Sequence, residues 1–448
     1  MKQFDKDKYL KNLNFKRNLT KYGKYFYIGV PCVLAVVAGI YFAYSKFTVS
    51  KDAEVVKTTV GEFIHGDVVI GAYIDGKYST TIPGKNDGYV VKSVSCDNNA
   101  TGSWDKDKWG LTLTNMTKRT KCNIYFETKK NSVSDVINEA VNTNSSMFAS
   151  DDADKNVRYI GANPNNYVYF NCSDYNNQSD STCEKWRIIG IFNNVTKSDG
   201  TKENLVKIIR DESIGNYSWD NKNTSTGAET NYGKNDWTTA RLNYLLNPGH
   251  DSESVGGSLY YNAKSGTCYY GQNNATTSCN FTSTGLKNDT TRNAIESVVW
   301  NLGGTDAYDT STASMFYTAE RGTTVYSGRP TTWTGKIGLM YPSDYGYATT
   351  GGSTTNRSTC LSTALFNWDG SGVADCKNND YLFNSSFQWT LAPISGYANG
   401  VFGVDSLGYV NYYYVRDTYG VRPALYLKSS ISVGSGDGTS TSPYKLEM

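Results

Sequence analysis

The most apolar stretch of the chain is residues 25–44, in which no side chain is charged. As a helix this stretch is long enough to cross a hydrocarbon core of ~30 Å. Residues 1–24 are rich in Lys and Arg, so the positive-inside rule predicts a cytoplasmic N-terminus. We therefore expect a basic cytoplasmic tail at 1–24, one transmembrane helix at 25–45, and an extracellular C-terminal ectodomain at the plasma membrane. The alternative is a cleaved signal peptide, against which the length of the apolar run argues.

Residues 53–128 alternate apolar and polar side chains in short runs, which predicts a small all-β module. The predicted strands are separated by polar turns and span 68–75, 78–83, 88–96, 109–116 and 121–128. The first two of these strands form a hairpin. We interpret the module as a spacer, because its core is modest without a covalent staple.

Residues 129–154 are predicted to form a helical linker. Within it, 131–150 has helical periodicity, with Ser134 as the expected cap and Val133, Ile137 and Val141 on one face.

Residues 155–448 are predicted to be one large α+β domain. Its strand-like runs are 167–170, 186–192, 205–210, 336–341 and 424–428, and its helix-like runs are 237–247 and 293–302. Long loops rich in Asn, Ser, Thr and Gly connect these elements, and such loops commonly carry function.

Nine cysteines are present, and eight of them fall into pairs that are close in sequence. The pairs are Cys96 with Cys122, Cys172 with Cys183, Cys268 with Cys279, and Cys360 with Cys376. Such pairs predict four loop-closing disulfides in an oxidising compartment. Zinc binding is disfavoured, because the chain has no C-x-x-C spacing and only two histidines.

The net charge of +2 comes from 44 basic and 42 acidic residues, and the basic excess lies before the ectodomain. The slightly acidic remainder excludes a basic surface for nucleic acid. Tyrosine is abundant, at 36 residues, alongside much Asn, Ser, Thr and Gly. This mixture is typical of binding surfaces, although an AT-rich genome also raises Asn, Lys and Tyr.

Sequence motifs within about the last seventy residues resemble those of a known protein family. WTLAP at 389–393 precedes a hairpin-like segment, and GVRPAL follows at 420–425. With the WRIIG run at 186–190, this pattern resembles C-type-lectin-fold modules of the formylglycine-generating-enzyme type. It also resembles the variable proteins of diversity-generating retroelements, which display a mutable patch on this scaffold.

The resemblance implies roles for particular residues. Trp186, Trp389, Gly420 and Arg422 would form the structural core, and the ligand surface would fall between Ser395 and Asp417. The expected ligand-binding residues are Tyr397, Asn399, Phe402, Ser406, Tyr409, Asn411, Tyr413 and Arg416. On the strand 409–415 side chains alternate between faces, and Val410 indicates that 410, 412 and 414 point inward. The alternative is an ordinary hairpin with half-buried tyrosines.

Three departures from the family limit what the resemblance implies. The E-P-N or Q-P-D loop and the W-N-D strand of calcium-dependent lectins are absent, so calcium-bridged sugar binding is not expected. Acidic loops such as 174–180 could still hold a structural calcium; no other cofactor is expected. The reactive cysteines of the enzyme relatives are best matched by Cys360 and Cys376, which a disulfide explains better. His65 and His250 have no triad context, so no catalytic residue is assigned.

The sequence thus predicts a single-pass surface protein that recognises or adheres to a protein or glycan on another cell, a phage or a matrix. The alternatives are an envelope-acting enzyme, either a carboxylate hydrolase or a diverged thiol oxidase, and a structural envelope protein.

Overall fold

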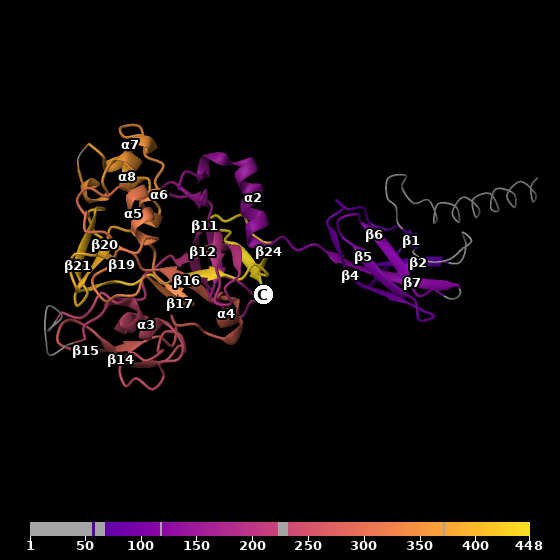
Figure 1. Cartoon of the computed structure of the whole chain (residues 1–448), viewed down its shortest axis with the longest axis horizontal. Coiled ribbons are helices and arrows are strands. Elements are labelled where there is room, and N and C mark those ends of the chain that lie inside the picture. Colours follow the sequence, from indigo (N-terminus) through magenta and orange to yellow (C-terminus); the bar gives the residue numbers. More distant parts are fainter. Residues whose placement is uncertain (1–55, 59–67, 117–118, 223–231, 371) are drawn as a thin grey trace, which may run out of the picture. The chain divides into compact units, whose positions relative to one another are not determined.

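The computed structural model describes residues 56–58, 68–116, 119–222, 232–370 and 372–448. The chain divides into two compact units, Met1–Lys129 and Lys130–Met448, which are drawn in Figure 1. The boundary lies within the segment predicted as a linker. Each unit has its own hydrophobic core.

The described part of the first unit is built of β-strands. A four-stranded sheet has the order β3-β2-β7-β4, and a three-stranded sheet has the order β1-β6-β5. The strands are β1 (Val56–Thr58), β2 (Val68–Ile74), β3 (Lys77–Ser79), β4 (Tyr89–Cys96), β5 (Thr101–Asp105), β6 (Gly110–Thr114) and β7 (Thr120–Thr128). The predicted hairpin is confirmed as the antiparallel pair β2–β3.

The core of the first unit is small. Leu111, Leu113, Ile124 and Phe126 are its main buried apolar side chains. Alternate residues of β7 point inward, which is the pattern of a strand with one buried face.

The second unit is organised around a large sheet whose main path is β18-β23-β12-β11-β10-β25-β24. Its strands are β8 (Phe148–Ala149), β9 (Val157–Tyr159), β10 (Tyr167–Phe170), β11 (Glu184–Thr196), β12 (Lys202–Arg210), β18 (Ile337–Gly338), β23 (Ala424–Leu427), β24 (Ser432–Ser435) and β25 (Tyr444–Glu447). The five predicted strand-like runs all contribute to this sheet. Consecutive residues of β11 and β12 are buried, so both faces of the sheet are covered.

A second sheet of five strands, in the order β13-β22-β19-β20-β21, carries the C-terminal hairpin. Its strands are β13 (Asn216–Ser218), β19 (Gln388–Pro393), β20 (Gly400–Val404), β21 (Val410–Tyr414) and β22 (Thr418–Gly420). Two separate hairpins complete the strand structure: β14 (Ser265–Tyr269) with β15 (Thr276–Asn280), and β16 (Val298–Asn301) with β17 (Thr332–Gly335).

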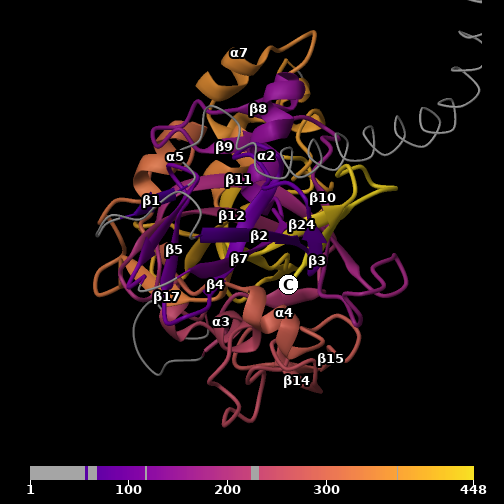
Figure 2. The same cartoon turned by 90° about the vertical axis from the view of Figure 1, so that its right-hand side faces the viewer.

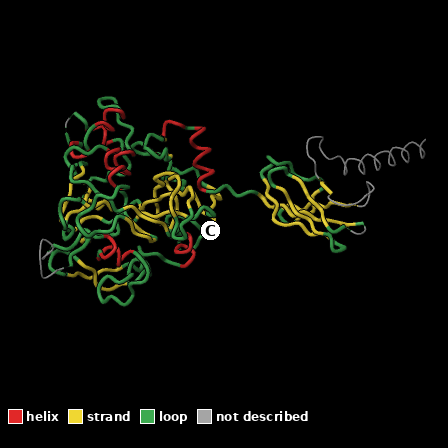
Figure 3. Tube along the Cα trace, in the orientation of Figure 1, coloured by secondary structure: helices red, strands yellow, loops and turns green. Residues whose placement is uncertain are grey.

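The helices of the second unit are short, apart from α2. They are α2 (Val133–Thr143), α3 (Arg241–Leu246), α4 (Asp289–Ala294), α5 (Ala313–Glu320), α6 (Pro342–Tyr347), α7 (Arg357–Ser362) and α8 (Ala374–Asn378). Helices α5 and α7 lie at one end of the unit, and α3 lies with the β14–β15 hairpin at the other (Figures 1 and 2). Loops connect most elements, as Figure 3 shows.

The predicted helix at 293–302 is wrong. Helix α4 ends at Ala294, and Val298–Asn301 forms β16, which pairs with β17. The β-branched Val298 and Val299 favour a strand once a partner strand is available.

The predicted linker helix also needs correction. Helix α2 begins after Ser132, whose side chain accepts from the Asp135 N–H at 3.1 Å, so the cap is Ser132 and not Ser134. Val133 and Ile137 are buried in the core of the second unit, so the helix is a packed element of that unit.

The predicted fold class is wrong in two respects. The described chain is mostly β-sheet with short helices, and an α+β description overstates the helices. Nor is any helix in the described ranges long and apolar enough to cross a membrane. The predicted tail at 1–24 and span at 25–45 lie outside those ranges. The corrected fold class is therefore a mostly β protein with no transmembrane helix assigned.

The four predicted disulfides are confirmed. They join Cys96 to Cys122, Cys172 to Cys183, Cys268 to Cys279, and Cys360 to Cys376. The first joins neighbouring strands β4 and β7, in which the two cysteines are directly opposite each other. In the second unit, Cys172–Cys183 closes the loop between β10 and β11, Cys268–Cys279 joins β14 to β15, and Cys360–Cys376 joins α7 to α8.

Candidate functional site

The hairpin β20–β21 lies at one edge of the five-stranded sheet. Every residue of β20 is buried, whereas β21 is the end strand and is partly exposed. The tight turn between them is held by Asp405, whose Oδ1 accepts from the Leu407 N–H at 2.7 Å. Gly408 completes the turn with a φ of 93°, a conformation that favours glycine. The turn therefore presents β21 in a defined position.

A row of five aromatic rings extends from this hairpin onto two neighbouring loops. Tyr397 stacks on Tyr412 at a centroid distance of 5.3 Å, and Tyr412 meets Tyr308 edge to face at 5.0 Å. Phe366 continues the row, 5.7 Å from Tyr308 and 5.9 Å from Tyr409. Edge-to-face and offset contacts of this kind hold aromatic rings in fixed orientations.

A second group of side chains is centred on Tyr414, which lies two residues after Tyr412 on β21. Tyr414 packs on Tyr232 at 5.5 Å, and the Arg416 guanidinium lies 4.0 Å from the Tyr232 ring centroid. The two groups together are here named the aromatic face, which consists of Tyr232, Tyr308, Phe366, Tyr397, Tyr409, Tyr412, Tyr414 and Arg416.

The aromatic face is open to solvent at several points. Tyr397 is 50% exposed and Tyr414 is 47% exposed, so each presents about half of its surface to solvent. A groove of about 310 Å³ follows β21. Its lining comprises Tyr308, Phe366, Asn411, Tyr412, Tyr413, Tyr414 and Asp417. The face thus combines exposed rings with a concave strip that carries amide and carboxylate groups.

Two predicted ligand-binding residues are not displayed. Phe402 is fully buried and packs edge to face on Phe316 at 4.9 Å, while Asn399 is 8% exposed. Both belong to the segment around β20, which is covered on both faces. The prediction is therefore wrong for Phe402 and Asn399.

The predicted orientation of β21 is also wrong. Tyr414 is the most exposed residue of the strand, whereas Tyr413 packs against Phe387 and Tyr419. The Tyr413 hydroxyl donates to Asp405 Oδ2 at 2.9 Å, and burial raises the pKa of Tyr413 well above its usual value. Rings from other segments decide which face packs, and the alternation within the strand does not reveal them.

Five other predicted residues surround the hairpin. Tyr397 and Tyr409 belong to the aromatic row, and Arg416 lies over Tyr232. The Asn411 side chain accepts from the Tyr412 N–H at 2.8 Å, and it lines the groove. Ser406 is half-buried in the turn and donates to Asp405.

The residues assigned to the structural core are all buried. Trp186 packs on Phe170, and the Trp389 indole N–H donates to the Tyr217 carbonyl. Arg422 donates to the carbonyls of Arg210 and Leu382, at 2.9 and 3.0 Å, and therefore joins β12 to the β19 region. At Gly420 an added Cβ would lie 2.9 Å from the Phe387 carbonyl oxygen, which leaves no room for a side chain.

Sequence reasoning missed five members of the aromatic face, namely Tyr232, Tyr308, Phe366, Tyr412 and Tyr414. The first three come from segments distant in sequence from the hairpin. Their aromatic character within polar stretches is the one signal that the sequence offers. Nothing in that signal indicates that the loops meet.

The described ranges contain no group of three or more His, Cys, Asp or Glu side chains arranged to hold a metal ion. The Asp180 carboxylate, in the acidic loop predicted for calcium, accepts from Tyr169 and pairs with Lys185. His250 stacks on Tyr244 at 4.0 Å, and His65 lies outside the described residues. Comparison of the chain with protein-family models, curated proteins and solved structures finds no match.

Proposed function

We propose that this protein is a non-catalytic recognition protein that binds a protein ligand through the aromatic face. The observation that carries the proposal is the row of mutually packed rings that ends in half-exposed Tyr397, which stacks on Tyr412 of the strand that also carries half-exposed Tyr414. A cluster of exposed rings of this kind is typical of an interaction site.

The composition of the face favours a protein partner. Tyr and Arg are among the side chains that most often dominate binding energy at protein interfaces. Tyr in particular buries much area with little loss of side-chain entropy. The rings of Tyr397 and Tyr412 are already held by each other, which reduces the entropic cost of ordering them on binding.

The groove along β21 supports the same proposal. β21 is the end strand of its sheet, and an end strand offers backbone groups to an extended segment of a partner. Tyr308 and Phe366 line the same groove and could contact alternate side chains of that segment.

The scaffold fits a protein that works outside the cytoplasm. Four disulfides require an oxidising compartment to form and persist. The resemblance to C-type-lectin-like modules belongs to the same proposal, since that fold presents its ligand surface at the hairpin that here carries β21.

The test is a ligand selection followed by affinity measurement. The purified protein is screened against a displayed peptide library and a glycan array, and any ligand is titrated against wild type and the double variant Tyr397→Ala/Tyr414→Ala. We expect a peptide or protein ligand whose affinity falls roughly 100-fold in the double variant, as for the loss of two interface anchors.

The matched control is Met315→Ala. Met315 is 46% exposed on α5 and is not part of the aromatic face, so its removal should leave the affinity unchanged. Ligands that bind wild type and the double variant equally would refute the proposal. Selection of glycans alone would refute the proposal that the ligand is a protein.

A further inference from the structure

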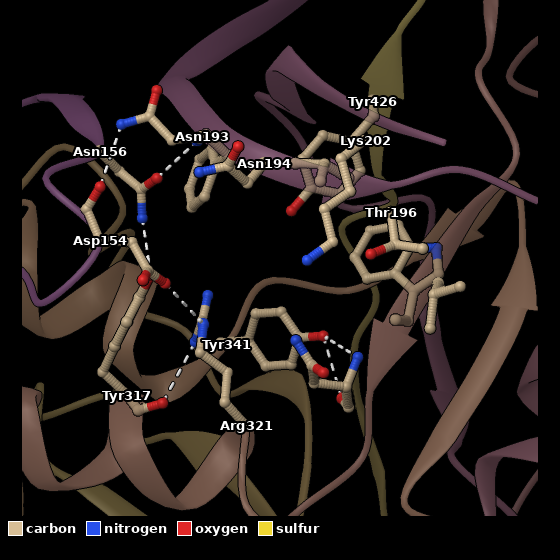
Figure 4. Close-up of a pocket in the computed structure, with 15 residues that line it drawn as sticks. Asp154, Asn156, Asn193, Asn194, Thr196, Lys202, Tyr317, Arg321, Tyr341 and Tyr426 are labelled. Carbon is tan, nitrogen blue, oxygen red and sulfur yellow. Dashed lines mark hydrogen bonds and ion pairs between the residues drawn. The ribbon is translucent and has the colours of Figure 1, made fainter. Parts of the chain in front are cut away.

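A polar cavity lies in the second unit, among residues that the proposed recognition surface does not use. Its volume is about 560 Å³, within the range of sites that bind small molecules. The walls come from the end of the β11–β12 hairpin, from β16 and from the C-terminal end of α5 (Figure 4).

Two cations face this cavity from different elements. Lys202 begins β12, and its ammonium group points into the cavity (Figure 4). No residue in the described ranges pairs with that ammonium group. Arg321 directly follows α5, and its guanidinium lies 3.4 Å from the Tyr317 ring centroid. Its Nη1 donates to the Tyr317 carbonyl and pairs with Glu320 Oε2 at 3.2 Å. Its Nη2 has no partner in the same described part of the chain.

The carboxylates near these two cations, Asp154 and Glu320, both pair with Arg321 and not with Lys202. Asp154 is the one carboxylate among the lining residues, and it already accepts from the Tyr317 hydroxyl at 2.6 Å. It also lies 3.7 Å from Arg321 Nε. The wall therefore has an uncompensated positive charge at Lys202.

Deeper charges near the cavity pair with one another within the protein. Lys207 pairs with Asp344 at 2.5 Å, and Arg158 pairs with Asp344 and Asp152, each at 2.8 Å. All four side chains are almost fully buried. The contrast singles out Lys202, whose position leaves its charge available to a ligand.

An irregularity in β11 shapes the same cavity. The register of β11 against β12 shifts between Phe192 and Val195, and Asn194 has a φ of 55°. The Asn194 side chain thereby lies at the cavity wall (Figure 4). Bulges of this kind re-aim side chains and are common beside functional sites.

The remaining lining is aromatic and amide. Phe192, Trp300, Tyr341 and Tyr426 line the cavity, and the Tyr426 hydroxyl projects into it (Figure 4). Asn301 adds a further amide next to Tyr341. Aromatic rings with amide and hydroxyl groups suit a ring-shaped ligand that carries several hydroxyls.

We propose that this cavity binds an acidic sugar, whose anionic group lies between Lys202 and Arg321 and whose ring lies against the aromatic lining. An anion would satisfy both unpaired donor groups, and charge-assisted bonds of this kind are stronger than neutral ones. The site is separate from the aromatic face, and the proposal does not depend on the proposed function.

The experiment is a calorimetric titration of the whole protein with glucuronate, glucose 6-sulfate and glucose. We expect at least one of the two acidic sugars to bind and glucose not to bind. The two acids distinguish a carboxylate from a sulfate as the preferred anion. Binding should weaken with added salt, because the charged groups are close to solvent.

Variants locate the site. Lys202→Ala should weaken binding roughly ten- to hundred-fold, and Asn194→Asp should weaken it too by placing a negative charge at the wall. Lys155→Ala, which removes an exposed lysine outside the lining, and Tyr397→Ala, which alters the aromatic face, should bind as wild type does. Circular dichroism and the melting temperature establish that each variant is folded.

Three results would overturn the inference. The first is that glucose binds as tightly as the acidic sugars, which would show that charge does not matter. The second is that none of the three sugars binds at millimolar concentration. The third is that an acidic sugar binds Lys202→Ala and wild type equally, which would place its site elsewhere on the molecule.

Discussion

The Tyr413 hydroxyl lies 2.9 Å from Oδ2 of Asp405, and Asp405 is almost fully buried at the turn of the β20–β21 hairpin. This bond connects the strand that carries the aromatic face to the turn that positions it. The tyrosine expected to contact ligand therefore holds the hairpin together. Its neighbour Tyr414 is the residue that reaches solvent.

Tyr413→Phe is expected to lower the free energy of unfolding by about 1–3 kcal/mol, because it removes a hydrogen bond to a buried carboxylate. The measurement is urea unfolding followed by tryptophan fluorescence. Tyr414→Phe is the matched control and should change stability by less than about 0.5 kcal/mol, since its ring is half exposed. Equal effects of the two variants would contradict the structural role of Tyr413.

Glu320 makes stability depend on pH. Burial raises the pKa of Glu320 to about 7 from 4.5, although Ser343 donates to its carboxylate through both N–H and hydroxyl. The folded protein therefore holds this proton over a pH range in which the unfolded chain has lost it. Stability from this group is greatest below pH 4.5 and falls as the pH rises to about 7.

The contribution of Glu320 to the pH dependence of stability is isolated by comparing wild type with Glu320→Gln, whose side chain cannot titrate. The difference in unfolding free energy, wild type minus variant, should decrease by about 3 kcal/mol between these two pH values and stay constant above. Urea unfolding at several pH values measures it. A difference that does not vary with pH would show that Glu320 is ionised throughout.

The disulfide Cys96–Cys122 should contribute to the stability of the first unit alone. The bridge spans 26 residues in a unit with a small core, and the loop-entropy relation assigns it about 3–4 kcal/mol. Cys96→Ala/Cys122→Ala should therefore raise hydrogen exchange throughout the described strands of that unit. Cys360→Ala/Cys376→Ala is the control, and it should leave exchange in the first unit unchanged. Unaltered protection in the first variant would mean that the core suffices without the bridge.

Gly190 allows two strands to approach closely. A Cβ at this position would lie 2.1 Å from the Val157 carbonyl oxygen and 2.9 Å from the Arg158 Cα. Gly190→Ala should therefore force β9 away from β11 and cost about 1–3 kcal/mol in unfolding free energy. Thermal unfolding compares it with Gly372→Ala, where an added Cβ meets no atom within 4 Å. Similar melting temperatures for the two variants would contradict the close packing.

Local features of the chain could be predicted from its sequence. The cysteine pairs are close in sequence and form disulfides, and the β2–β3 hairpin and the strand runs of the large sheet follow from their own apolar patterns. These features depend on neighbouring residues, so the pattern within one segment is sufficient. The helix predicted at 293–302 failed because its apolar residues suited a strand equally well, and pairing with β17 decided between the two.

The candidate sites depended on contacts between distant segments. Tyr308 and Phe366 reach the β21 hairpin from separate loops, and Lys202 and Arg321 meet at one cavity from a strand and a helix end. By itself the sequence determined the residue types, the disulfide pairs and many of the strands, since these follow from local chemistry and periodicity. Only the tertiary structure decided which tyrosines are exposed and which cation at the cavity lacks a partner, because exposure and charge pairing depend on what other segments place nearby.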